Sequence, residues 1–150
     1  MKLDSVGKIL DYAIQKEQDA ADFYSALAAT MDHVNMKQVF QGFSLEEQAH
    51  KAKLLAIKSG QKLLSSDQRV QDLKIGDHLI DVALTPDLGY QEALIVAMKA
   101  EKAAFKLYHD LAEAADDTVL RAVFLGLAQE EARHKLRFEI EYDERMLNDN

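Results

Sequence analysis

Two short segments of the chain carry the same pattern, a glutamate followed three residues later by a histidine. They are Glu47-Gln48-Ala49-His50 and Glu131-Ala132-Arg133-His134. Residues three apart lie at neighbouring points of one helix face, so each carboxylate and imidazole can reach the same metal ion. A further glutamate, Glu17 or Glu101, lies 30 residues before each segment. Mixed nitrogen and oxygen ligands suit iron, manganese or zinc better than calcium or magnesium, which prefer oxygen alone.

Both patterns belong to an internal repeat. A shift of 84 positions superposes residues 10–53 on residues 94–137 without a gap, and 15 of the 44 pairs are identical. The identical pairs include all the residues named above as candidate ligands: Glu17/Glu101, Glu47/Glu131 and His50/His134. Chance would give only a few matches, so we interpret the chain as a duplicated unit that covers about 5–60 and 89–145.

Each unit is predicted to be a helical hairpin. Apolar residues recur at alternating spacings of four and three over about 5–31 and 35–59, and the same seam returns over 94–115 and 120–138. One proline and six glycines leave few helix breakers. Gly60 is a plausible stop for the second helix, and Thr85-Pro86-Asp87 a cap region for the third long helix.

About 25 residues, 61–85, connect the two hairpins. Their periodicity is weaker, and a short helix is expected around 66–73, where Ser65, Ser66 and Asp67 offer caps. A connection of this length can carry the chain from one end of a bundle to the other. We therefore predict a single all-α domain over residues 1–150, a four-helix bundle made of two hairpins and a long crossover.

Ionisable residues interrupt the apolar seam of every long helix. They are Glu17, Glu47, His50, Glu101, Glu131 and His134. An isolated buried carboxylate costs several kcal/mol unless it is neutralised or paired, and no Lys or Arg occupies the seam. Four carboxylates contribute −4, which two divalent ions balance. The sequence therefore predicts a carboxylate-bridged dinuclear centre, with iron as first choice and a manganese or mixed-metal pair as second.

Alternatives exist for several of these residues. Glu46 and Glu130 could replace Glu47 and Glu131, because a spacing of four residues also reaches the histidine. Glu47 and Glu131 are favoured, because they are the glutamates that continue the row of apolar positions on each helix. Tyr24 and Tyr108 follow the first glutamates by seven residues, on the same face. They are candidates both for hydrogen-bond donors that orient those carboxylates and for ordinary core aromatics.

The remaining histidines, two helical glycines and the acidic tail are interpreted as structural features and not as parts of the site. We expect His33, His78 and His109 at the surface, and close helix packing at Gly42 and Gly126. The acidic tail from Glu139 to Asp149 is predicted to be a solvated helix end, in which Glu141 falls on the seam but near the frayed terminus.

Composition excludes several classes of function. The net charge of −8 argues against binding to nucleic acid, and the absence of cysteine excludes disulfides, thiolate catalysis and cysteine-ligated clusters. The sequence shows neither a signal-peptide core nor a long uncharged stretch, so we expect a cytoplasmic protein without membrane contact.

The six candidate ligands and their flanking words, Phe23-Tyr24 and Phe43-Ser44-Leu45-Glu46, resemble the ferritin-like di-iron carboxylate proteins, and rubrerythrin-type domains most closely. The resemblance spans residues 5–145. It implies that Glu47 and Glu131 bridge two irons, while Glu17 with His50 and Glu101 with His134 are terminal ligands. It also implies reaction with peroxide or dioxygen, a role in oxidative stress, electrons from a partner, and a homodimer.

Three departures from the family pattern qualify this expectation. The chain lacks the four cysteines of a rubredoxin-like domain, so electrons must come from another molecule, such as a rubredoxin-like protein. Ala104 stands where many rubrerythrins carry an additional carboxylate, which puts efficient peroxidase chemistry in doubt. Gln48 replaces the haem-ligating Met of bacterioferritins, which disfavours haem binding.

The sequence leaves three alternative functional hypotheses. The first is a non-haem di-iron oxidoreductase that acts on peroxide or dioxygen. The second is a metal-binding or iron-storage protein without turnover. The third is a purely structural bundle whose acidic core is protonated.

Overall fold

The structure, a computed structural model, describes residues 4–60, 67–85 and 88–148. All regular secondary structure within these ranges is helical, which confirms the all-α prediction. The chain divides into two compact units, Met1–His78 and Leu79–Asn150, and each contains one of the two repeats. Ser65, Ser66, Pro86 and Asp87, which the sequence suggested as cap residues, lie outside the described residues.

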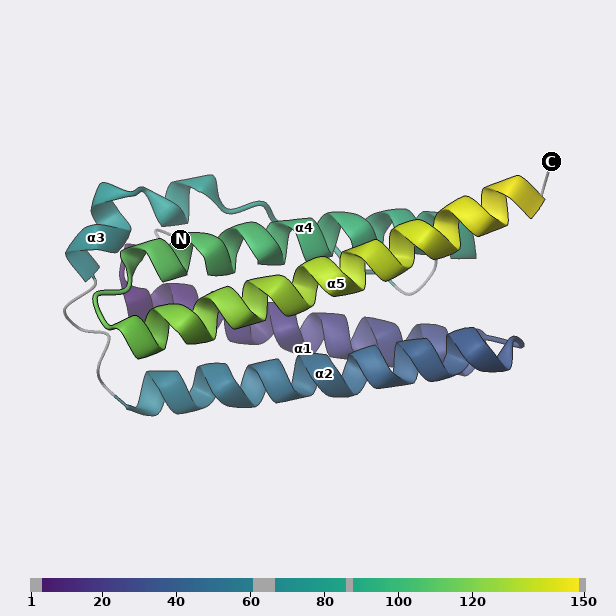
Figure 1. The fold of residues 1–150 in the computed structure, drawn as a ribbon, viewed down its shortest axis with the longest axis horizontal. Helices are drawn as coiled ribbons and strands as arrows, with labels where there is room; N and C mark the ends of the chain where they lie inside the picture. The colour runs from purple at the N-terminus through teal and green to yellow at the C-terminus, as the bar shows by residue number, and fades with distance from the viewer. Residues whose placement is uncertain (1–3, 61–66, 86–87, 149–150) are drawn as a thin grey trace. The chain divides into compact units, whose positions relative to one another are not determined.

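The first unit is built on a hairpin of two long helices, α1 (Val6–Thr30) and α2 (Val34–Ser59), which run antiparallel in Figure 1. Both bounds agree with the predicted ranges to within about one residue. Ser5 caps α1, because its hydroxyl accepts a hydrogen bond from the backbone N–H of Lys8 at 3.2 Å. Gly60 ends α2, and its N–H donates to the carbonyl of Ala56 at 3.1 Å.

A short segment of the predicted crossover packs against the start of α1. It contains α3 (Asp67–Asp72), the predicted short helix, and a single 3₁₀ turn, η2 (Ile75–His78). The Asp67 carboxylate accepts a hydrogen bond from the Val6 N–H at 2.8 Å, and the Gln71 side chain donates to the Asp4 carbonyl at 3.0 Å. A carboxylate at a helix N-terminus satisfies an unpaired N–H and complements the helix dipole.

The second unit is the hairpin of α4 (Tyr90–Ala114) and α5 (Thr118–Asn148). Gly89 is the N-cap of α4. Asp117 caps α5, and its Oδ1 accepts from the N–H groups of Val119 at 2.7 Å and Leu120 at 3.2 Å. The Arg121 guanidinium donates to the carbonyls of Ala112 at 3.3 Å and Ala115 at 2.9 Å, so α5 satisfies the C-terminal end of α4.

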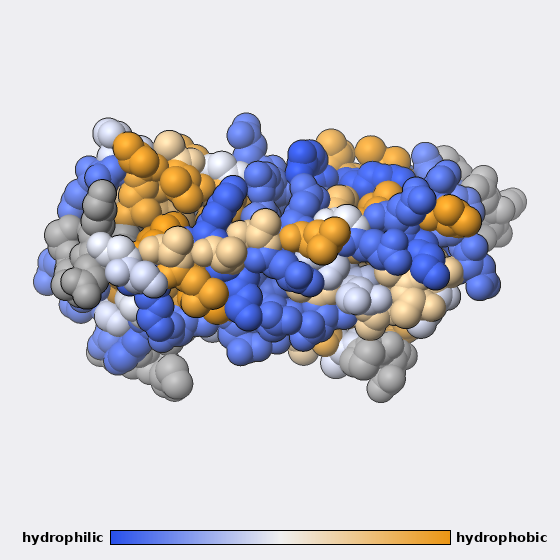
Figure 2. Space-filling model, turned by 90° about the horizontal axis from the view of Figure 1, so that it is seen from below, coloured by the Kyte–Doolittle hydropathy of each residue, from blue (hydrophilic) through white to orange (hydrophobic). Residues whose placement is uncertain are grey.

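The apolar seams predicted from the sequence supply the buried side chains of both hairpins. In the first unit they include Leu10, Ala13, Tyr24, Phe40 and Leu54. In the second they include Leu94, Ala97, Leu111, Phe124, Leu127 and Phe138. Figure 2 shows one face of the molecule, where hydrophilic side chains predominate and hydrophobic ones gather in separate patches.

The acidic tail continues α5 to Asn148, and Asp143, Glu144 and Arg145 are exposed, in agreement with the predicted solvated helix end. Glu141, which continues the seam of this helix, is only 9% exposed. The Glu141 carboxylate accepts a hydrogen bond from the Tyr90 hydroxyl at 2.8 Å. One structural expectation is wrong: Gly42 and Gly126 are not sites of close packing, since a Cβ built at either position would meet no atom within 4 Å.

Candidate metal centre

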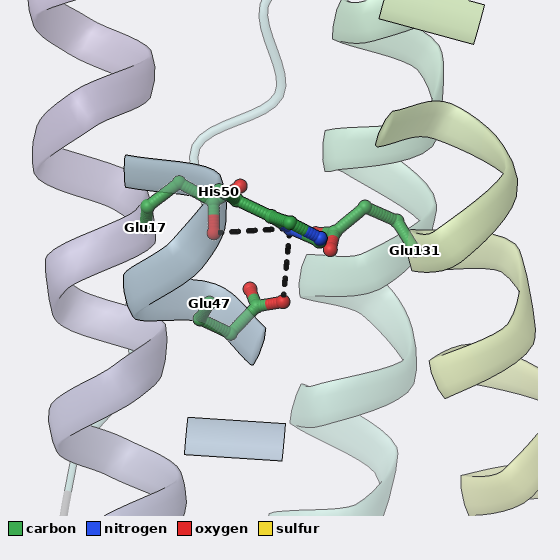
Figure 3. Close-up of side chains that lie close together, drawn as sticks. All are labelled: Glu17, Glu47, His50 and Glu131. Atoms are coloured by element: carbon green, nitrogen blue, oxygen red, sulfur yellow. Dashed lines mark ion pairs between the residues drawn. The ribbon is translucent and has the colours of Figure 1, made fainter. Parts of the chain in front are cut away.

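The first hairpin brings three of the predicted ligands together. Glu17 extends from the middle of α1, and Glu47 and His50 from adjacent turns of α2. The His50 Nδ1 lies 3.6 Å from Glu17 Oε2 and 3.4 Å from Glu47 Oε1, as the dashed lines in Figure 3 show. All three side chains are buried, at 1–2% exposure. The antiparallel hairpin therefore places the α1 glutamate at the height of the Glu-x-x-His pair, as the sequence predicted.

The second hairpin repeats the arrangement. Glu101 comes from α4, and Glu131 and His134 from α5. The His134 Nδ1 lies 3.6 Å from Glu101 Oε1 and 3.8 Å from Glu131 Oε1. Exposure is 0–1% for these side chains. The duplication that was visible in the sequence thus produces two equivalent groups of two carboxylates and one imidazole.

The spacing of the donor atoms fits metal ligands. Two atoms bound to one ion at about 2.1 Å, and separated by an angle of about 90–110°, lie about 3.0–3.4 Å apart. The imidazole-to-carboxylate separations approach this range without any side-chain rearrangement. Within each hairpin the three side chains each offer a ligand atom within 4.8 Å of the other two.

The chemistry of the donor set also fits a transition metal. Each group contains two anionic oxygen ligands and an imidazole, a combination typical of iron and manganese sites. Buried carboxylates need a nearby positive charge, and a divalent ion at each group supplies one charge for each of the two carboxylates. The residues present therefore fit one divalent ion in each hairpin.

Burial distinguishes between the alternative glutamates. Glu46 and Glu130 are only half-buried, whereas their neighbours Glu47 and Glu131 are fully buried. The glutamates favoured by seam phase are also the ones that lie beside the histidines. His33, His78 and His109 are exposed, as expected.

Tyr24 is completely buried in a cluster of aromatic rings. Its ring stacks on Phe40 at a centroid distance of 6.4 Å and meets the edges of Phe43 at 6.3 Å and Phe23 at 5.8 Å. Tyr108, its counterpart in the second unit, is 2% exposed. These contacts agree with a core role for Tyr24, and the orienting role of both hydroxyls stays a prediction.

Sequence reasoning missed polar contacts that accompany the first group. The Lys51 ammonium donates to Gln18 Oε1 at 2.8 Å, and the buried Ser44 hydroxyl donates to the Ala21 carbonyl at 2.8 Å. Both bonds join α1 to α2. The only sequence signal was a serine and a lysine at helix positions near the ligands, which is common on any helix.

Comparisons with known proteins agree with this reading of the residues. A family model for rubrerythrin matches residues 8–73 and 92–150. A solved structure from Thermotoga maritima, described as a ferritin-like diiron-carboxylate protein, superposes with a TM-score of 0.75 at 17% sequence identity. The match covers 94% of this chain and 96% of the other. No curated protein matches the chain.

The structural likeness confirms the ferritin-like four-helix bundle fold that the repeat predicted. Among the described residues, no helical segment combines the length and the hydropathy that a membrane span requires. The rubrerythrin model extends over most of both hairpins and includes all six candidate ligands, each of which is buried. The chain therefore belongs to the rubrerythrin family, and it is a dinuclear metal protein.

Proposed function

We propose that the protein is a non-haem di-iron oxidoreductase that reduces peroxide or reacts with dioxygen, using electrons from an external donor. One observation carries the proposal: each hairpin gathers two buried glutamates around one buried histidine, with ligand spacing. As the family resemblance implies, Glu47 and Glu131 would bridge the ions. Glu17 with His50, and Glu101 with His134, would be the terminal ligands.

The overall reaction with hydrogen peroxide is a two-electron reduction. The O–O bond breaks, two electrons and two protons are taken up, and two water molecules leave. When bound, a pair of ferrous ions supplies these two electrons, one from each ion. An external donor then returns two electrons. These 150 residues contain no cysteine and so no rubredoxin-type iron site of their own, which supports a separate donor such as a rubredoxin-like protein.

The side chains of the chain would hold the ions and control their surroundings. The carboxylates neutralise the ions as deprotonated ligands, and the imidazoles bind through a neutral ring nitrogen. Exposure of 2% or less for all six ligands keeps bulk water away from the site. The buried Tyr24 and Tyr108 would donate their phenolic protons as hydrogen bonds that orient Glu17 and Glu101.

One residue favours the second candidate, metal binding or storage without turnover. Ala104 is half-buried one turn after Glu101, where a carboxylate that responds to iron oxidation would be expected in many rubrerythrins. An alanine has no ligand atom. If this position is essential, the centre binds metal but turns over poorly. A cytoplasmic location and a homodimer accompany both candidates as predictions from the sequence and the resemblance.

A single-turnover experiment tests the proposal. The full chain is loaded anaerobically with two equivalents of Fe(II), one equivalent of hydrogen peroxide is added, and ferric absorption and residual peroxide are followed. We expect two Fe(II) oxidised for each peroxide consumed. His50→Ala combined with His134→Ala should abolish the rapid rise in ferric absorption. His109→Ala serves as the control, because His109 is exposed. Two bound irons with no loss of peroxide would contradict the redox function and leave metal storage.

A further inference from the structure

The two hairpins hold equivalent ligands, but the polar side chains beside those ligands differ. In the first hairpin, two side-chain hydrogen bonds cross from α2 to α1 beside the ligands. Lys51, the residue after His50, donates to Gln18, the residue after Glu17, at 2.8 Å. Ser44, three residues before Glu47, donates to the carbonyl of Ala21 at 2.8 Å. These bonds lie on either side of the ligand level and fix the two helices relative to each other there.

The Lys51–Gln18 bond is itself held from a second side. The Gln18 amide nitrogen donates to Asp22 Oδ1 at 2.8 Å, one turn further along α1. The amide is therefore oriented with its oxygen toward the lysine. Lys51 and Gln18 are partly buried, so water competes less for this hydrogen bond than at an open surface.

The repeat replaces both bonding partners in the second hairpin. At an offset of 84, Gln18 corresponds to Lys102 and Ser44 to Ala128. The ammonium of Lys102 cannot accept a hydrogen bond from Lys135, the counterpart of Lys51, and Ala128 has no hydroxyl to donate. The Lys135 ammonium instead pairs with Glu139 on its own helix. Leu55 occupies the equivalent of Glu139 in the first unit, so Lys51 has no such alternative.

One of the ligand distances follows the same order. The His50 Nδ1 lies 3.4 Å from Glu47 Oε1, whereas the His134 Nδ1 lies 3.8 Å from the corresponding Glu131 Oε1. The distances from these imidazoles to Glu17 and Glu101 are equal, at 3.6 Å. A ligand set that is held near its bound geometry loses less conformational freedom on binding, and so binds more tightly. The two hydrogen bonds and the shorter His50–Glu47 distance therefore both favour tighter metal binding by the first hairpin.

We infer that the two metal positions are unequal, and that the Glu17–Glu47–His50 set of the first hairpin binds the first ion. Lys51 and Gln18 act as positioning residues for this set. The Glu101–Glu131–His134 set binds the second, more readily exchanged ion. This inference rests on the metal centre of the proposed function, but not on its reaction with peroxide.

Binding of Co(II), added alone to the full chain, tests the inequality without any turnover. His134→Ala leaves the first set intact and His50→Ala leaves the second, and visible absorption reports each dissociation constant. One well-formed hydrogen bond corresponds to about a two- to tenfold change in affinity, so we expect His134→Ala to bind Co(II) tighter than His50→Ala by about that factor.

Swapping the bracing residue gives the decisive comparison. Gln18→Lys gives the first hairpin the residue of the second. Combined with His134→Ala, it should abolish the tighter Co(II) binding of the first set. Gln18→Glu keeps an acceptor for Lys51 and should retain the tighter Co(II) binding. Lys135→Met, made with His50→Ala, is the matched control and should change the dissociation constant by less than about twofold. Circular dichroism confirms that each variant is helical.

The wild-type chain provides a second readout that needs no ligand mutation. In imidazole-labelled protein, the ring nitrogen signals of His50 should shift with the first half equivalent of Zn(II), before those of His134. Equal or reversed affinities, simultaneous shifts, or an unaffected Gln18→Lys variant would overturn the inference. Unequal binding without peroxide reduction would refute only the proposed redox function, whereas wild-type protein that binds no Co(II) would refute the metal centre and the inference together.

Discussion

Replacement of Glu47 by glutamine keeps the size and shape of a buried side chain and removes its charge. We expect this change to remove much of the stability that the protein gains from metal. Glu47 is 1% exposed, and its Oε1 lies 3.4 Å from the imidazole of His50. In the proposed centre, four carboxylates would balance two divalent ions. With Glu47→Gln, three carboxylates face the same two ions, and a net positive charge is left in a buried site.

The size of this stabilisation follows from the coupling between metal binding and folding. A metal present at 100 times its dissociation constant stabilises the folded state by about 2.7 kcal/mol for each ion, or about 5 kcal/mol for two. For a chain of this size that corresponds to a rise in Tm of roughly 10–20 °C. The uncompensated charge costs about as much as one bound ion contributes, so Glu47→Gln should show half of the wild-type rise or less.

Thermal unfolding of the full chain, followed by circular dichroism with and without Mn(II), measures this rise. Glu46→Gln is the matched control, because Glu46 is the adjacent glutamate but only half-buried. It should retain the whole metal-dependent rise. If Glu47→Gln keeps the full rise, or if Glu46→Gln loses it, the buried glutamates are not the ligands.

Three further predictions concern stability. Gly42→Ala should raise the free energy of unfolding by about 0.5–1 kcal/mol in urea titrations, because the added methyl meets no atom within 4 Å and alanine favours a helix; a decrease would mean that the position is crowded. Arg121→Ala should cost about 1–2 kcal/mol in the same assay, since the guanidinium satisfies two carbonyls at the end of α4; Arg121→Lys should recover part of the loss. Burial and the hydrogen bond to Glu141 raise the pKa of Tyr90 far above its ordinary value. The unfolded chain therefore releases this proton first as the pH rises above 10, so stability should fall there, and Tyr90→Phe should weaken that fall. An unchanged slope of stability against pH in Tyr90→Phe would contradict this assignment.

The long helices and the ligand groups were predictable because both depend on local spacing. Periods of three and four fix the buried face of a helix, and a short turn fixes which residues of an antiparallel hairpin share a height. Glu17 and His50 therefore meet in the structure as the sequence predicted. Burial also agrees with the choice of Glu131 over Glu130, since a shift of one residue turns a side chain by about 100° around the helix.

Features that depend on long side chains or on tertiary neighbours were not predictable. Lys51 and Lys135 are identical in the repeat, yet one bonds across the hairpin and the other along its own helix, because their neighbours differ. Glu141 falls on the seam of its helix, but its place in an acidic segment near the frayed end made a solvated position the simplest expectation. The hydrogen-bond donor to Glu141, Tyr90, lies 51 residues away and does not follow from any pattern within α5.

Each set of two glutamates and one histidine lies within 34 consecutive residues, from Glu17 to His50 or from Glu101 to His134. Chain segments so close in sequence meet quickly, because closing a short connection costs little entropy. A hairpin emerging from the ribosome has its metal donors in reach before the remainder of the chain has been synthesised. Cofactor acquisition in this architecture can therefore begin during translation and guide folding, rather than wait for a finished protein.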